Sequence, residues 1–184
     1  DCYHGMGRYP RPMPAGIGME GAGVVDAVGD GVTSVNTGDR VAYAAGPPGS
    51  YAEKRIIDAA KVVRIPDGIS DETAAAMMLQ GMTAEYLVNR CYPVNVGEFA
   101  LVHAAAGGVG LYLCQWLKSL GVTVIGTTTS AAKKELILAN GAAYAVNSRT
   151  ENYTELAREV TGGEGVHVVY DSVGPDVWSA SLDA

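Results

Sequence analysis

The sequence predicts an α/β protein built from a small β-rich domain over residues 1–75 and a doubly wound parallel sheet over residues 76–184. Three observations lead to this prediction. Short β-branched runs separated by glycine and proline turns fill the first part of the chain, and strands alternate with helices after residue 70. A glycine-rich turn then joins the first of these later strands to its helix, which is where such sheets bind ligands.

Four short strands are expected in the β-rich part, at roughly the ten-residue spacing that is typical of small barrels and sandwiches. The last one ends at the turn sequence Pro66-Asp67-Gly68. The expected strands cover residues 21–29, 40–44, 50–57 and 61–65. The boundary between the two domains is expected between residues 68 and 80.

The later part begins with a helix that Ser70 caps, because a serine hydroxyl accepts from the free amides of a first helical turn. Asp71 and Glu72 favour the positive end of that helix. Apolar strands separated by helices then imply right-handed crossovers, and so a parallel sheet. The expected strands are residues 100–103, 122–127, 143–147 and 166–171, and the expected helices are residues 108–120, 131–140 and 153–161.

Composition narrows the class of protein. The 184 residues include 13 Lys and Arg against 20 Asp and Glu, a formal net charge of −7, and no basic stripe, which argues against nucleic-acid binding. No apolar stretch reaches the ~20 residues of a spanning helix and no secretory leader is visible, so no membrane association and a cytoplasmic location are expected. Three scattered cysteines are typical of free thiols. The chain does not begin with Met, and we interpret it as an excerpt of a longer protein.

The strongest local motif is Ala105-Ala106-Gly107-Gly108-Val109-Gly110, between a predicted strand and a predicted helix. In the register of G-x-G-x-x-G, Ala105 takes the place of the first glycine. Gly107 leaves the backbone bare for a pyrophosphate, and Gly110 lets the helix pack tightly on the strand. The helix N-terminus offers free amides and a partial positive charge to the phosphates. The motif therefore predicts a dinucleotide site, with a plain strand-to-helix connector as the alternative.

The residues at the end of the second strand of the predicted sheet distinguish a site for NAD from a site for NADPH. NAD sites usually place an acid there, against the ribose 2′-hydroxyl. This chain has Gly126-Thr127-Thr128-Thr129-Ser130, and no acid follows before Glu135. Hydroxyl groups followed by Lys133 and Lys134 suit a 2′-phosphate, so NADPH is the predicted cofactor, with Thr127 and Thr128 among its ligands. The alternative is that these hydroxyls only cap the next helix.

Several segments together resemble a known family. They are Gly18-Met19-Glu20-Gly21-Ala22-Gly23, Gly38-Asp39-Arg40-Val41, Leu79-Gln80-Gly81-Met82-Thr83-Ala84, His103-Ala104-Ala105-Ala106-Gly107-Gly108-Val109-Gly110 and Tyr170-Asp171-Ser172-Val173-Gly174. In this order they resemble the quinone oxidoreductase branch of the medium-chain dehydrogenase/reductase superfamily, which includes zeta-crystallin. The resemblance covers essentially the whole chain. It implies part of a GroES-like catalytic domain and part of a Rossmann domain, with an active site in the cleft between them.

The resemblance also implies site residues. Tyr3 and Tyr9 match tyrosines near the nicotinamide and the substrate cleft, where Tyr3 would hydrogen-bond a developing oxyanion. Ser148 departs from the family, because relatives often have a tyrosine there that covers the 2′-phosphate, and Arg149 is expected to take part instead. The matched cofactor residues are Thr83 beside the nicotinamide, Ala106, Gly107, Gly108 and Val109 at the pyrophosphate, and Lys133 at the 2′-phosphate.

No bound metal is expected. Zinc alcohol dehydrogenases of the superfamily have Gly-His-Glu where this chain has Gly18-Met19-Glu20, and a thioether does not replace imidazole on zinc. A second ligand position falls at about Gln80, and the four-cysteine structural lobe is absent from the sequence. Alcohol oxidation needs a Lewis acid to generate an alkoxide, whereas a quinone is already electrophilic.

The resemblance therefore implies an NADPH-dependent, zinc-independent reductase that transfers a hydride or single electrons to a quinone. Reduction of α,β-unsaturated ketones or aldehydes is one alternative, and a non-enzymatic NADPH- and RNA-binding role, as in some zeta-crystallin relatives, is another. The family resemblance also implies a homodimer that is paired through strands beyond residue 184. From its place at a strand end, His103 is expected to be a hydrogen-bonded structural histidine, and Cys114 a buried and inert thiol.

Overall fold

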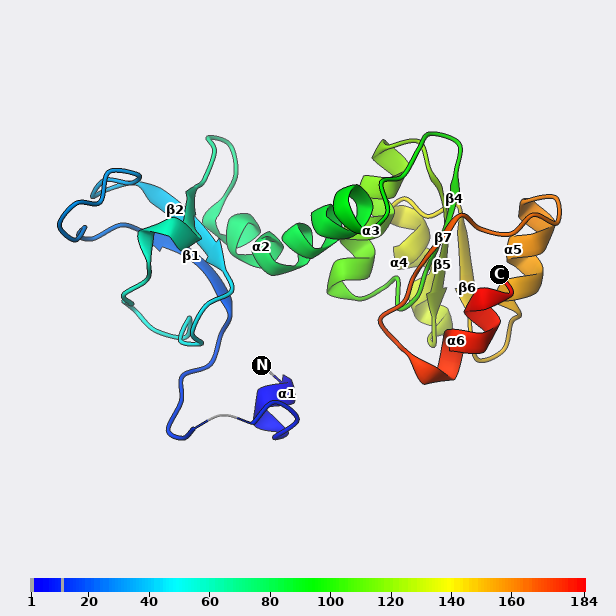
Figure 1. Ribbon diagram of the computed structural model, residues 1–184, viewed down its shortest axis with the longest axis horizontal. Coiled ribbons are helices and arrows are strands. Elements are labelled where there is room, and N and C mark those ends of the chain that lie inside the picture. Colours follow the sequence, from blue (N-terminus) through cyan, green and yellow to red (C-terminus); the bar gives the residue numbers. More distant parts are fainter. Residues whose placement is uncertain (1, 11) are drawn as a thin grey trace. The chain divides into compact units, whose positions relative to one another are not determined.

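The computed structural model describes residues 2–10 and 12–184, which form two compact units. The first unit ends at Leu79 and the second begins at Gln80. Figure 1 labels the elements along the chain. The division falls inside the helix α2 (Asp71–Tyr86), whose first turns belong to the first unit and whose last turns belong to the second.

The first unit is built on a three-stranded antiparallel sheet in the order β1-β2-β3. In its register Ala22 faces Ala42 across the first pair of strands, and Ala42 faces Val63 across the second. A small apolar core of Ala42, Ile65 and Ala74 lies beside this sheet. The elements are α1 (Cys2–Gly5), β1 (Glu20–Val24), β2 (Arg40–Ala44), the 3-10 helix η1 (Ala59–Lys61) and β3 (Val62–Arg64).

The strand expected over residues 50–57 is wrong, because the structure has bends and irregular backbone there. Gly49 has a φ of 145°, and the Arg55 guanidinium donates to the Pro47 carbonyl oxygen at 3.0 Å and to the Ser50 hydroxyl at 3.1 Å. Ile56 is fully exposed, so the apolar residues of this segment bury no common face. The alternation of residue types alone could not reveal this.

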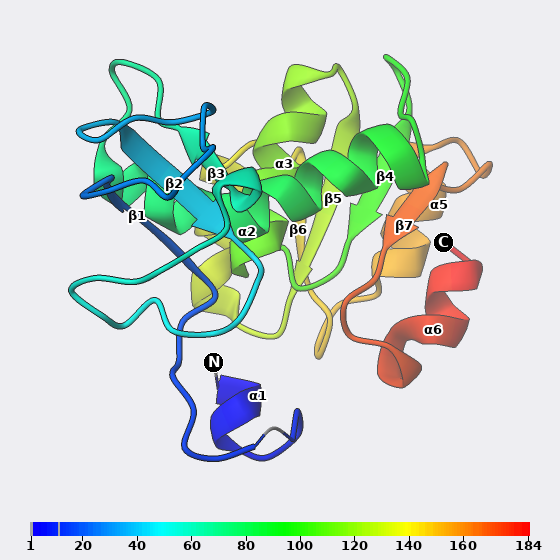
Figure 2. The same cartoon turned by 60° about the vertical axis from the view of Figure 1, so that its left-hand side comes forward.

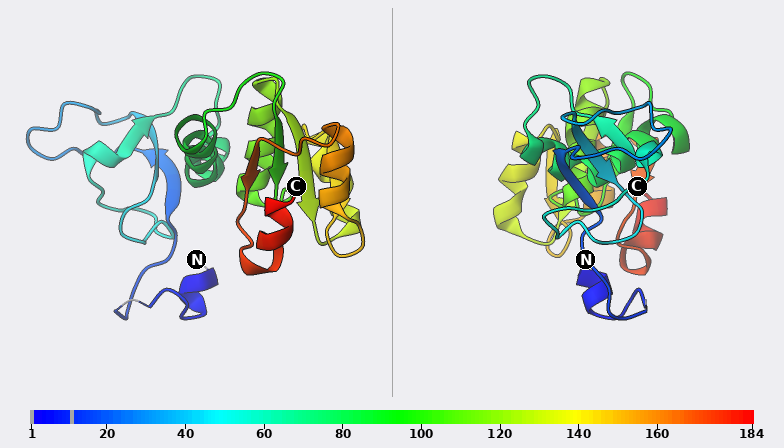
Figure 3. Two further views of the ribbon diagram at one scale, coloured as in Figure 1. Left: turned by 45° about the vertical axis from the view of Figure 1, so that its right-hand side comes forward. Right: turned by 90° about the vertical axis from the view of Figure 1, so that its left-hand side faces the viewer.

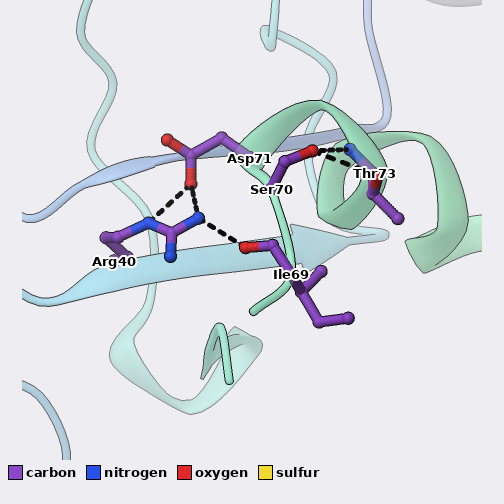
Figure 4. A network of polar contacts seen from close by, with 5 residues as sticks. All are labelled: Arg40, Ile69, Ser70, Asp71 and Thr73. Carbon is purple, nitrogen blue, oxygen red and sulfur yellow. Dashed lines mark hydrogen bonds and ion pairs between the residues drawn. The ribbon is translucent and has the colours of Figure 1, made fainter. Parts of the chain in front are cut away.

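The junction of β2 and α2 is held by polar contacts that Figure 4 shows from close by. Arg40 donates from Nε and Nη2 to one Asp71 carboxylate oxygen at 2.9 and 2.7 Å, and from Nη2 to the Ile69 carbonyl at 2.7 Å. The Ser70 hydroxyl accepts from the Thr73 amide at 3.1 Å. The predicted cap of this helix is therefore confirmed, and the strand is tied to the helix at its first turn.

The second unit is a parallel four-stranded sheet in the order β6-β5-β4-β7. Helices α3 and α4 pack on one face, where Leu117 and Ile137 are fully buried, and α5 and α6 pack on the other, around Leu101 and Ile125 (Figures 2 and 3). The doubly wound sheet is confirmed. Its strands are β4 (Phe99–Val102), β5 (Thr123–Thr128), β6 (Tyr144–Asn147) and β7 (Val168–Tyr170), and its helical elements are the π-helix η2 (Leu87–Cys91), α3 (Gly108–Ser119), the 3-10 helix η3 (Ala131–Lys133), α4 (Lys134–Ala139), α5 (Tyr153–Val160) and α6 (Pro175–Leu182).

Candidate dinucleotide-binding site

The turn between β4 and α3 has a backbone that only certain residues allow. Ala104 lies in the left-handed region at a φ of 48°, and its carbonyl accepts from the Gly107 amide at 2.8 Å. A Cβ on Gly110 would lie 2.6 Å from the Ala104 oxygen and from the Ala105 Cα, so a side chain there would push α3 away from the loop. Gly107 is the N-cap of α3 and has no side chain to cover the free amides of its first turn. This bare helix N-terminus fits a pyrophosphate.

A cavity of about 520 Å³ opens beside this turn, within the size range of small-ligand sites. Its walls come from the β4–α3 turn, the ends of β5 and β6, and the first residues of α5 and α6. The lining residues are His103, Ala104, Ala106, Gly107, Thr127, Thr128, Thr129, Ser130, Lys133, Ser148, Arg149, Tyr153, Val173, Asp176 and Val177. The structure thus brings seven sequence-predicted residues together: Ala106, Gly107, Thr127, Thr128, Lys133, Ser148 and Arg149.

The cations at the end of β5 and β6 differ in their partners. Lys134, which the sequence also suggested for the 2′-phosphate, does not line the cavity and instead contacts both carboxylate oxygens of Glu151 at 2.8 Å. The hydrogen bond from Lys134 is the main cause that lowers the pKa of Glu151. Neither Lys133 nor Arg149 forms a salt bridge in the part of the chain that the structure describes, and both line the cavity. Two uncompensated positive charges beside one cavity suit an anionic group.

The hydroxyl groups of this region serve different purposes. The Thr128 hydroxyl accepts from the Ser130 amide at 3.2 Å, which shapes the turn after β5. Ser148 donates from its amide and its hydroxyl to the Thr128 carbonyl at 2.9 and 3.3 Å, which joins the ends of β6 and β5. Ser130 precedes η3 without making a side-chain cap, so helix capping does not account for these hydroxyls.

His103 is buried at the base of the cavity and is hydrogen-bonded, as expected. Its Nδ1 lies 2.9 Å from the Thr127 hydroxyl and its Nε2 lies 2.8 Å from the Ser181 hydroxyl. Its ring meets the Tyr153 ring edge to face at 5.1 Å. Burial lowers the pKa of His103, and the charge of Asp171 partly opposes this shift. Sequence reasoning missed Ser181 and Tyr153, which lie in helices 78 and 50 residues further along the chain.

Other residues from the sequence analysis do not line the cavity. Gly108 and Val109 lie in the first turn of α3, and Thr83 lies in α2. Tyr9 belongs to the first unit, where its ring contacts His4 at 5.7 Å between centroids. Tyr3 falls in α1, but its side chain is outside the described residues.

Within residues 2–10 and 12–184, no three His, Cys, Asp or Glu side chains gather into a group that would hold a metal ion. None of their helices has both the length and the apolar character needed to cross a membrane.

The parallel sheet, the glycine turn and the cavity define a Rossmann-type dinucleotide-binding unit. Comparison with known proteins agrees with this class. Residues 1–67 match the profile of the alcohol dehydrogenase GroES-like domain, and residues 108–184 match that of the zinc-binding dehydrogenase family. These matches cover parts of two domains of the medium-chain dehydrogenase/reductase superfamily and are consistent with its quinone oxidoreductase branch.

The similar proteins extend beyond this chain. It is 50% identical to a quinone oxidoreductase of Pseudomonas aeruginosa and 41% identical to a 2-haloacrylate reductase of Burkholderia, and in each case 100% of the chain matches 57% of the relative. The crystal structure of Escherichia coli quinone oxidoreductase complexed with NADPH superimposes with a TM-score of 0.94 at 47% identity, covering 100% of this chain and 56% of that one. The chain therefore spans little more than half the length of these relatives.

Proposed function

We propose that the protein containing this chain is a zinc-independent reductase that uses NADPH to reduce a quinone. The observation that carries the proposal is the cavity at the end of β5, where Lys133 and Arg149 have no salt-bridge partner among the described residues. No acid stands between Gly126 and Lys134 to repel a 2′-phosphate. The names of the quinone oxidoreductase relatives and the NADPH complex of one of them support the same reading.

The residues of the second unit divide the binding of the cofactor between them. The pyrophosphate would lie against the backbone of Ala106 to Val109, at the N-terminus of α3. The 2′-phosphate would lie between Lys133 and Arg149, with Thr128 and Ser148 beside it. When bound, NADPH supplies the hydride or electrons at its nicotinamide.

The remaining site residues are proposed from the family resemblance. Thr83 would orient the nicotinamide, while Tyr3 and Tyr9 would line the substrate cleft. Their task is to hold the acceptor at the nicotinamide and to exclude water, and Tyr3 would donate a hydrogen bond to the developing oxyanion. Met19 and Gln80 stand at positions where zinc relatives have ligands, so no metal-activated alkoxide is proposed.

A second candidate is reduction of an activated alkene, favoured by the 41% identity to 2-haloacrylate reductase. A homodimer and a cytoplasmic location are further proposals that rest on the family alone. An RNA-binding role is disfavoured by the net charge of −7.

The test uses the full-length protein that contains this chain. NADPH and NADH are titrated by fluorescence, and 1,4-benzoquinone, 9,10-phenanthrenequinone and 2-chloroacrylate are then supplied as acceptors with and without a chelator. Preference for NADPH with quinone-dependent oxidation that a chelator does not change is the expected result. Equal affinity for NADH would overturn the cofactor assignment. Turnover of 2-chloroacrylate without quinone turnover would favour the second candidate.

A further inference from the structure

The hydrogen bonds around His103 form a chain in which each donor and acceptor can be assigned, starting from the Val177 carbonyl oxygen. The Ser181 hydroxyl donates to this carbonyl at 2.7 Å, and a carbonyl oxygen can only accept. The one proton of Ser181 is thereby committed. At its 2.8 Å contact with His103 Nε2, Ser181 must therefore accept, so Nε2 carries a proton.

The tautomer of His103 follows from this direction. A neutral imidazole has one protonated nitrogen, so Nδ1 is an acceptor when Nε2 is a donor. The Thr127 hydroxyl, 2.9 Å away, therefore donates to Nδ1. Burial, which leaves His103 only 2% exposed and lowers its pKa, favours this neutral form. The protons of the chain from Thr127 through His103 and Ser181 to Val177 all point away from β5 toward α6.

Thr127 and Thr128 consequently differ in what they can offer a ligand. The proton of Thr127 is committed to His103, so its oxygen can only accept from a group in the cavity that it lines. The Thr128 hydroxyl accepts from Ser130, and no acceptor for its own proton is found among the described residues. Thr128 can thus donate to a phosphate oxygen. Thr127 has no proton left to donate, so the lone pairs of its oxygen would repel the phosphate oxygens.

We propose that His103 is a positioning residue that holds the Thr127 hydroxyl as an acceptor, so that Thr127 receives a hydrogen bond from a ribose hydroxyl of the dinucleotide. This assignment rests on the proposed function. It leaves the 2′-phosphate to Thr128, Lys133 and Arg149. The end of the second strand of a Rossmann sheet is where the adenosine ribose is bound, and with the 2′-oxygen phosphorylated the 3′-hydroxyl is the donor that this ribose retains. In this proposal Thr127 contacts the ribose in place of the phosphate that its position in the sequence suggests, because its hydroxyl has no free proton to donate to a phosphate oxygen.

The first test reads the tautomer directly, without ligand. Long-range proton–nitrogen NMR spectra of the full-length protein labelled with ¹⁵N-histidine distinguish the two neutral forms, and His103→Asn identifies the signal by its loss. The expected result at pH 7.5 is a neutral ring protonated at Nε2. A ring protonated at Nδ1, or a doubly protonated ring, would overturn the assignment.

The second test measures binding by calorimetry with adenosine 2′,5′-bisphosphate and its 3′-deoxy analogue. The parent should bind the 3′-deoxy probe about three- to tenfold more weakly, the size of one hydrogen bond. Thr127→Val should bind both probes equally, whereas the matched control Thr128→Val should weaken both and keep the discrimination. Equal binding of the two probes by the parent, or full discrimination in Thr127→Val, would sink the proposal.

His103 itself is tested with two substitutions that each keep half of its contacts. Asparagine places an oxygen near the position of Nδ1 and can still accept from Thr127, whereas glutamine places an amide nitrogen near Nε2 and can only serve Ser181. His103→Asn should keep the discrimination and His103→Gln should lose it, and a merely structural histidine would give the same result in both. If the parent binds neither probe nor NADPH, the proposed function fails, and the NMR result separates that outcome from failure of the tautomer. Should His103→Gln not fold, the comparison of Thr127→Val with Thr128→Val decides alone.

Discussion

Lys134 and Glu151 are joined at 2.8 Å through both carboxylate oxygens, and Glu151 also accepts from the Asn147 amide at 2.8 Å. This pair ties the first turn of α4 to the loop that follows β6. It leaves the neighbouring Lys133, on the cavity wall, without a salt bridge among the described residues. Two adjacent lysines thus have separate tasks, which a comparison of matched substitutions can test.

Replacing Lys133 by glutamine should weaken NADPH binding by about tenfold or more and leave NADH binding nearly unchanged, because a charge-assisted contact to the 2′-phosphate is lost. Lys134→Gln is the control. It should lower Tm slightly while changing the NADPH/NADH ratio little, since its charge is already used by Glu151. Titration of both cofactors by fluorescence checks this. A larger change in the ratio for Lys134→Gln than for Lys133→Gln would reverse the assignment.

Gly110→Ala should destabilise the second unit, because the new Cβ would lie 2.6 Å from two backbone atoms of the β4–α3 turn. Overpacking of this kind costs about 1–3 kcal/mol, and the displaced helix end should weaken NADPH binding as well. Gly29→Ala is the matched control, since nothing lies within 4 Å of its added Cβ and its φ is not positive. Thermal unfolding with and without NADPH measures both effects. Equal Tm values for the two variants would contradict the close packing of Gly110.

The sequence predicted the second unit closely. The strands expected at 100–103 and 122–127 are observed at Phe99–Val102 and Thr123–Thr128. Both strands are covered on both faces and are centred on buried apolar residues, and a glycine turn precedes each of them, at Gly97 and at Gly121. A segment of mixed polar and apolar residues that is partly exposed lacks such a signal. The wrong strand at 50–57 is of this kind, because its geometry depends on Arg55 contacts and on burial that periodicity does not encode.

The cavity could be predicted only in part, for a similar reason. The glycine turn and Lys133 lie in or next to a recognisable motif, so their positions follow from local spacing. Ser181 and Tyr153 enter the site because α5 and α6 fold back over the sheet, and nothing near either residue marks it. Likewise, the direction of the Thr127 hydrogen bond depends on a carbonyl 50 residues away in α6. Contacts between residues so far apart in the chain depend on how the helices pack on the sheet, and a local sequence motif carries no information about that packing.

Cys114 and Cys91 should react very differently with a thiol reagent. Cys114 is a fully buried residue of α3, and burial raises the pKa of its thiol to about 11, so little thiolate forms near pH 8. Cys91 is exposed. Iodoacetamide labelling followed by peptide mass spectrometry should modify Cys91 in the native protein and Cys114 only after unfolding in urea. Labelling of Cys114 at a comparable rate in the native protein would mean that α3 opens readily.

Stability should depend on the protonation of His103. Its environment consists of Thr127 from β5, Tyr153 from α5, Ser181 from α6 and the charge of Asp171 after β7. Burial is the larger effect and lowers the pKa of His103 below its ordinary value of 6.5, so the unfolded chain takes up this proton more readily than the folded one.

The sign of the effect follows from that difference. The contribution of His103 is complete above about pH 6.5 and is lost as the pH falls through the lower pKa of the folded state. Tm should therefore fall more steeply in the parent than in His103→Asn between about pH 7 and pH 5, because the variant has no ring to protonate. His4 and His167 are present in both proteins and cancel in the comparison. Parallel Tm curves would show that burial does not lower the pKa of His103 in the folded protein.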